Sequence, residues 1–98
     1  MRIRVQRSGG YAGISEELAA VDTDQLDPEV GKRIEQLVDQ AGFFALPAEQ
    51  AAGVGADFFR YEVSVIDDGR QHTVSFADDG SAETAPLRRL VEAVSAAA

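Results

Sequence analysis

The sequence predicts an α+β fold with the element order β-β-α-β-β-α: a four-stranded, mainly antiparallel sheet with two helices on one face. Four segments alternate apolar and polar residues, as half-buried strands do, and two others repeat apolar residues at helical spacing. Each strand has one apolar face and each helix one apolar stripe, which two packed layers can bury. The length of 98 residues suits a single domain spanning residues 1–98.

The first two predicted strands, residues 2–7 and 14–21, are expected to form an antiparallel hairpin. The first alternates cleanly between apolar and polar residues. The second is irregular, because Leu18 and Ala20 share its apolar side while Val21 falls out of phase. A β-bulge, which inserts one extra residue into a strand, would restore the register.

A helix is predicted to begin at Pro28, because Asp27 can cap it and proline fits the first helical position. The apolar residues at helical spacing are Val30, Ile34, Leu37, Val38 and Ala41. Gly31 inside the helix costs about 1 kcal/mol relative to alanine, so packing must stabilise this helix. Gly42 is placed to end it in the left-handed conformation. Three apolar residues that follow the helix are expected to fill the core; they are Phe43, Phe44 and Leu46.

The second half repeats the strand–strand–helix order after a long connection, residues 47–57, which has no clear period and is therefore expected to be functional or mobile. A strand is predicted at residues 58–66, followed by the turn Asp68-Gly69, which suits a type I′ hairpin, and a return strand. One face of these two strands carries Phe59, Tyr61, Val63, Val65, His72, Val74 and Phe76. A last helix is expected to be capped by Thr84. Its apolar stripe is Leu87, Leu90, Val91 and Val94.

Composition and charge narrow the classes of function. Nine basic and seventeen acidic side chains give a net charge of −8, which argues against nucleic-acid binding and suits a protein partner or plain solubility equally. The absence of cysteine excludes disulfides, thiolate metal sites and a cysteine nucleophile. Because the chain has neither an apolar leader at its start nor an apolar run of membrane length, we expect a cytoplasmic protein that does not bind membranes.

No residue pattern supports catalysis, so we expect a protein that is not an enzyme and holds no cofactor or metal. The single histidine, His72, falls on the inward face beside a turn and is expected to be packed rather than part of a Ser-His-Asp triad. The acidic pairs lack the spacing of a calcium loop; they are Glu16-Glu17, Asp67-Asp68 and Asp78-Asp79. The segment Gly53–Gly55 lacks the remainder of a phosphate-binding motif.

The segment RSGGYAGI, residues 7–14, is longer than a tight hairpin requires and carries Tyr11 among three glycines. Tyrosine is a good anchor for protein recognition because it is large and amphipathic and has few rotatable bonds. The residues alone leave two alternatives open. Tyr11 either is presented to a partner or folds back on the sheet as an edge plug.

Three segments resemble the emfourin family: MRIRVQRSGGYAGI at the start, FFALP at 43–47 and GADFFRYEVSVIDDGRQHTV at 55–74. A phenylalanine would be equally typical at the position of Tyr11, and from Ala77 onward the chain matches only in type. Emfourins are small protein inhibitors of thermolysin-like zinc metallopeptidases of the protealysin type. The resemblance therefore implies a bacterial, cytoplasmic inhibitor that blocks the active-site cleft of such a peptidase.

The resemblance does not fix how the inhibitor docks, so the contact residues are predicted from their chemistry. Glycines let the backbone approach an enzyme closely, and the loop is expected to enter the cleft with Tyr11 or Ile14 near a pocket for a large apolar side chain. The connection 47–57 would supply a second contact. The predicted partner-binding residues are Ser8, Gly9, Gly10, Tyr11, Ala12, Gly13 and Ile14. The alternative function is a non-inhibitory interaction or accessory module with the same fold.

Overall fold

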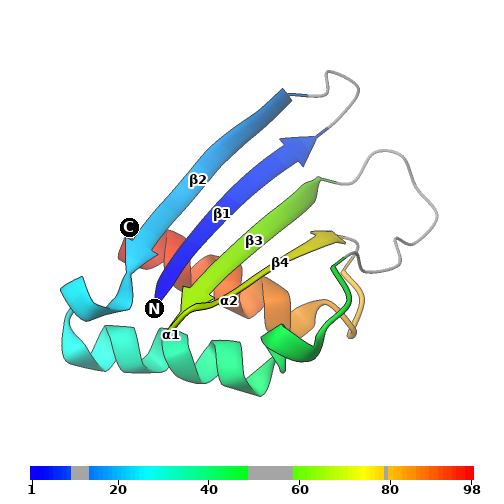
Figure 1. Ribbon diagram of the computed structural model, residues 1–98. Coiled ribbons are helices and arrows are strands. Elements are labelled where there is room, and N and C mark those ends of the chain that lie inside the picture. The colour runs from blue at the N-terminus through cyan, green and yellow to red at the C-terminus, as the bar shows by residue number, and fades with distance from the viewer. Residues whose placement is uncertain (10–13, 49–58, 79) are drawn as a thin grey trace.

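The computed structural model has one antiparallel sheet in the strand order β2-β1-β3-β4, and two helices pack against one of its faces (Figure 1). The structure describes residues 1–9, 14–48, 59–78 and 80–98. The elements are β1 (Arg2–Gly9), β2 (Ile14–Asp22), the 3₁₀ turn η2 (Thr23–Gln25), α1 (Pro28–Gln40), the 3₁₀ turn η3 (Phe43–Ala45), β3 (Arg60–Asp67), β4 (Arg70–Ala77) and α2 (Ala85–Ala97). The predicted fold class and element order are confirmed.

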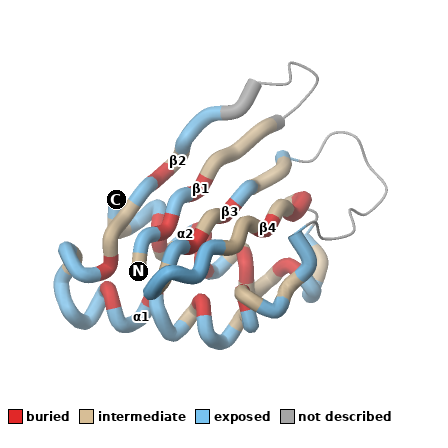
Figure 2. Tube along the Cα trace, in the orientation of Figure 1, coloured by how far each residue is buried: buried red, intermediate tan, exposed pale blue. Residues whose placement is uncertain are grey.

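One face of the sheet forms the core together with both helices. Val5 of β1 pairs with Ala19 of β2 and with Val63 of β3, so these three side chains point to the same side. The most deeply buried side chains are Ile3, Val5, Ile34, Phe43, Val63, Val65, Val74, Phe76, Leu87, Leu90 and Val94. Figure 2 shows the buried positions of the helices turned toward the sheet. The predicted inward faces of the first strand and of the last two strands are thereby confirmed over their central residues.

The bulge predicted in the second strand is confirmed, and Leu18 packs against the core as expected, but the inward position predicted for Ala20 is wrong. Ala19 pairs with Val5, and the next pair along the hairpin skips Leu18, which is therefore the extra residue. Ala19 is buried and Val21 half-buried, whereas Ala20, which was expected on the apolar side, is exposed. The reason is that an extra residue shifts the alternation of the strand by one position.

Helix α1 begins and ends as its sequence predicts. The Asp27 carboxylate accepts a hydrogen bond from the backbone N–H of Glu29 at 3.0 Å, and Pro28 occupies the first helical position. Gly42 lies just beyond the helix with φ 60°, in the left-handed region, and its N–H donates to the Asp39 carbonyl at 3.0 Å. These are the contacts by which helices commonly end at glycine.

The buried face of α1 contains Gly31, not Val30. Val30 was expected in the apolar stripe but is 40% exposed. Gly31 lies against η2, and a β carbon at this position would lie 2.6 Å from the carbonyl oxygen of Thr23. This close approach is the reason a glycine stands in the helix interior despite its low helix propensity.

The turn between β3 and β4 is the predicted type I′, since both Asp68 (φ 49°) and Gly69 (φ 81°) have positive φ. Strand β3 begins later than expected, and Phe59, just before it, is 49% exposed although it was placed on the inward face. Thr84 occupies the N-cap position of α2, but its hydroxyl donates to the Ser81 carbonyl instead of capping the helix. In the described part of the chain, neither helix is long and apolar enough to cross a membrane.

The chain that follows η3 covers the outer edge of β4. The Nε2–H of His72 donates to the carbonyl of Leu46 at 2.7 Å, and the N–H of Ser75 donates to the carbonyl of Ala48 at 2.8 Å. The imidazole ring also meets the Phe43 ring edge-on, with 5.7 Å between the ring centres. The prediction of a packed histidine is confirmed, and the chain after η3 occupies part of this edge of the sheet at Ser75.

Candidate protein-binding site

Four strand ends meet at one end of the sheet. Gly9, the last residue of β1, pairs with Ile14, the first of β2; Ser8 pairs with Arg60 at the start of β3, and Arg60 pairs with Ala77 at the end of β4. The β1–β2 connection, the connection into β3 and the loop from β4 to α2 therefore all attach here. Figure 1 shows that β1, β2 and β3 project past the helices at this end, so that the sheet continues as a single layer.

The structure places only part of the predicted contact segment. Ser8 is half-buried in β1, next to Arg60 of β3. The backbones of Gly9 and Ile14 form the last pair of the hairpin. The other predicted residues of this segment lie outside the described residues; they are Gly10, Tyr11, Ala12 and Gly13. Residues 49–57 of the predicted second contact also lie outside the described residues.

Beyond the helices, the inward side of the sheet changes from apolar to charged and aromatic. Arg7 points to this side, and its Nη2 donates to Glu16 Oε1 at 2.5 Å. The guanidinium carbon of Arg7 lies 4.7 Å from the centre of the Phe59 ring, in a cation–π contact. The register partner of Arg7 is Tyr61, whose ring stacks on Phe76 at 5.4 Å. We call Arg7, Glu16 and Phe59 the overhang face.

The hairpin that leads to this end carries no net charge, because three arginines of β1 stand against three carboxylates of β2. The N–O distances are 3.7 Å for Arg2–Asp22, 2.6 Å for Arg4–Glu17 and 2.5 Å for Arg7–Glu16. Exposed pairs of this kind contribute only about 0.2–1 kcal/mol each to stability. Their main consequence here is electrostatic, since the chain's net charge of −8 resides outside the hairpin.

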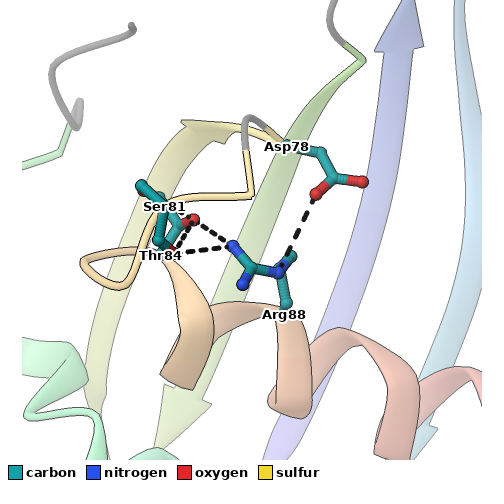
Figure 3. A network of polar contacts seen from close by, with 4 residues as sticks. All are labelled: Asp78, Ser81, Thr84 and Arg88. Carbon is teal, nitrogen blue, oxygen red and sulfur yellow. Dashed lines mark hydrogen bonds and ion pairs between the residues drawn. The ribbon is translucent and has the colours of Figure 1, made fainter.

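Arg88 of α2 fixes the loop that follows β4, as Figure 3 shows. Its Nη1 donates to the Ser81 carbonyl at 2.9 Å and to Thr84 Oγ1 at 2.5 Å, and its Nε lies 3.9 Å from Asp78 Oδ1. The backbone N–H of Asp78 in turn donates to the carbonyl of Phe59 at 2.8 Å. These contacts connect helix α2 to the backbone of the overhang face.

Several charged side chains described near this end of the sheet are engaged in ion pairs. Across residues 1–9, 14–48, 59–78 and 80–98, no three His, Asp or Glu side chains are grouped to hold a metal ion. The acidic pairs of the sequence contribute ion pairs with arginine: Arg7–Glu16, Arg4–Glu17, Arg70–Asp67 and Arg88–Asp78. The ring of His72, the chain's one histidine, is bound to a backbone carbonyl at the β4 edge.

The family model for Emfourin matches residues 5–95, which include β2, α1, β3 and β4 in full and most of β1 and α2. The chain belongs to the Emfourin family. Emfourin is an inhibitor family, so membership implies a protease-inhibitor type of role and a protease as partner. No curated protein and no solved structure matches the chain.

In this member of the Emfourin family, the reasoning from sequence missed the overhang face. One signal was available in β1, where the alternation that places Val5 inward continues to Arg7. A charged residue in an inward phase marks the point where a sheet leaves its core. No local signal predicts that Phe59 lies under that arginine or that Asp78 holds its backbone, because both contacts join residues distant in the chain.

Proposed function

We propose that this protein inhibits a thermolysin-like zinc metallopeptidase by placing the projecting end of its sheet in the active-site cleft of the enzyme. Membership in Emfourin supports the inhibitor role, and the resemblance of RSGGYAGI and the later segments supports this class of peptidase. A cytoplasmic bacterial setting is part of the same proposal. The role requires no catalytic group from the inhibitor itself.

The observation that carries the docking mode is the single-layered end of the sheet (Figure 1). One sheet layer is about 10 Å thick, whereas the body of the protein adds a layer of helices. A thin, projecting end can enter a cleft that is built to hold an extended peptide, while the helices remain outside. The β1–β2 connection and the connection into β3 both attach to this end, so one docking event brings both to the enzyme.

The proposed contact segment is Ser8, Gly9, Gly10, Tyr11, Ala12, Gly13 and Ile14, with Tyr11 as the anchor. A loop containing three glycines loses conformational entropy when it is ordered on binding, and this loss lowers affinity. The flanking strands limit that loss, because they are paired as far as Gly9 and Ile14 and carry three cross-strand ion pairs. Only residues 10–13 separate the two residues of the last pair, Gly9 and Ile14.

A titration tests the proposal directly. The protein is added to thermolysin or to a protealysin-type peptidase, and cleavage of a peptide substrate is followed. We expect saturable inhibition near one-to-one stoichiometry. If several such peptidases keep full activity at micromolar excess of the protein, the inhibitor proposal fails and a non-inhibitory interaction module takes its place.

The anchor role of Tyr11 is tested by Tyr11→Ala, which is expected to raise the inhibition constant at least tenfold, or about 1.4 kcal/mol. The matched control is Tyr11→Phe, which keeps the ring and is expected to stay within about threefold of the parent protein. Both variants need an unchanged thermal midpoint for the comparison to hold. A loss smaller than tenfold for Tyr11→Ala, with the fold intact, would rule out this residue as the anchor.

A further inference from the structure

Phe59 combines exposure with a fixed position, which sets it apart from the other exposed apolar residues. Three large apolar residues among those described are more than a third exposed, and Phe59 is the most exposed of them at 49%. Ile66 pairs with Arg2 at the opposite end of the sheet, and Val30 lies in the first turn of α1. Phe59 directly precedes Arg60, which pairs with Ser8 of the proposed contact segment.

The ring of Phe59 contacts the side chain of Arg7, and Arg7 in turn forms an ion pair with Glu16. Arg7 covers the ring at 4.7 Å from its centre, and the ion pair with Glu16 fixes the arginine in turn. The guanidinium of Arg7 therefore contacts two groups, the carboxylate of Glu16 and the ring of Phe59. An aromatic side chain restrained in this way loses little rotational freedom when a partner covers it.

The backbone of Phe59 is held from a different direction. Its carbonyl accepts the N–H of Asp78, whose carboxylate faces Arg88 of α2, and Arg88 also binds the loop at Ser81 (Figure 3). Helix α2 belongs to the buried core, since Leu87 is 2% exposed. The ring is therefore presented from a rigid base, as binding hot spots usually are.

We propose that Phe59 is a second anchor of the inhibitor, buried against an apolar surface of the peptidase beside its cleft, and that Arg7 is the residue that positions it. The inference rests on the proposed inhibitor function and extends it to residues that the 8–14 segment does not contain. Continuity supports the peptidase as the occupant, because Phe59 adjoins Arg60, the residue that pairs with Ser8 of the proposed contact segment. The neighbouring hairpin has no net charge, so it adds neither net attraction nor net repulsion to this contact.

The experiment compares inhibition constants for the parent protein, Phe59→Ala and the matched control Ile66→Ala against one inhibited peptidase. We expect Phe59→Ala to weaken inhibition at least tenfold and Ile66→Ala to change it less than twofold. A double-mutant cycle with Arg7→Ala separates positioning from direct contact. Arg7→Ala is expected to weaken inhibition in the parent background and to have no further effect once Phe59 is alanine, a coupling that a purely structural role would not produce.

A second measurement keeps the inference testable if a variant folds poorly. Relaxation of the Phe59 ring protons by a soluble paramagnetic agent is expected to fall when the unmodified protein binds the peptidase. If the parent inhibits but Phe59→Ala stays within twofold of it, or if the ring stays accessible in the complex, the second anchor is disproved and the inhibitor function stands. If the parent inhibits no peptidase, both proposals fall together. A ring that becomes covered in the protein alone as concentration rises assigns the surface to a second copy of the chain and also overturns the inference.

Discussion

Replacing Phe43 with alanine is expected to lower the free energy of unfolding by about 3–5 kcal/mol. The side chain is 1% exposed, and its ring meets Phe44 and His72 edge-on at 5.8 Å and 5.7 Å between ring centres. It packs from the single turn η3 against α1 and β4, so removing the ring leaves a cavity in the core. A domain of this size has about 5–15 kcal/mol of stability in total, so the variant loses a large share of it.

The measurement is chemical or thermal unfolding, in which the thermal midpoint is expected to fall by more than about 12 °C. Phe59→Ala is the matched control, because it removes the same atoms from a ring that is 49% exposed. Its loss should stay near the value of one exposed cation–π contact, about 0.5–1 kcal/mol. Equal losses for the two variants would contradict the assignment of Phe43 to the core and of Phe59 to the surface.

The parts of the fold that follow from the sequence are those whose causes are local. Asp27 caps α1, Gly42 ends it, and Asp68-Gly69 turns the second hairpin, each through contacts within a few residues. The alternation of apolar residues likewise predicts the inward faces of the strands wherever no residue is inserted. These signals together establish the element order, and the single apolar face of each element then predicts the two layers.

The features that the sequence did not predict depend on which strands and helices pack together in the fold. A bulge was needed in β2, but only the register with β1 shows that Leu18 is the extra residue and that Ala19 is therefore inward. Val30 fits the helical period as well as its neighbours do, yet the direction from which the sheet approaches α1 leaves it 40% exposed. Periodicity defines a face to within about one residue, and tertiary contacts decide the rest.

In the candidate site too, one part could be predicted from local sequence and the other depends on tertiary contacts. Glycines around Tyr11 predict that RSGGYAGI is a presented segment, and this prediction rests on composition alone. The overhang face requires three strands in register, because it joins Arg7, Glu16 and Phe59 from separate parts of the chain. A sequence can suggest a loop that makes contact, but the surface that supports the loop emerges only from the folded sheet.

The second large effect is expected at Gly31, where Gly31→Ala should destabilise the protein although alanine favours helices. Helix propensity alone would stabilise the variant by up to about 1 kcal/mol. The added β carbon would, however, lie 2.6 Å from the Thr23 carbonyl oxygen, closer than such atoms approach. Thr23 cannot easily move, because its N–H donates to the Met1 carbonyl at 2.9 Å and its hydroxyl donates to Glu35 Oε2 at 2.6 Å. Overpacking against a fixed backbone costs about 1–3 kcal/mol, so the clash outweighs the propensity.

A variant elsewhere in α1 separates the two contributions. Gln36 is exposed in the same helix, and Gln36→Gly is expected to cost about 0.5–1 kcal/mol by propensity alone. Adding a methyl group at Gly31 and creating a glycine at Gln36 should therefore both lower the midpoint of denaturant unfolding, although helix propensity predicts opposite signs. If Gly31→Ala instead raises the midpoint, η2 yields at little cost, and the contact between Gly31 and Thr23 does not determine how α1 packs.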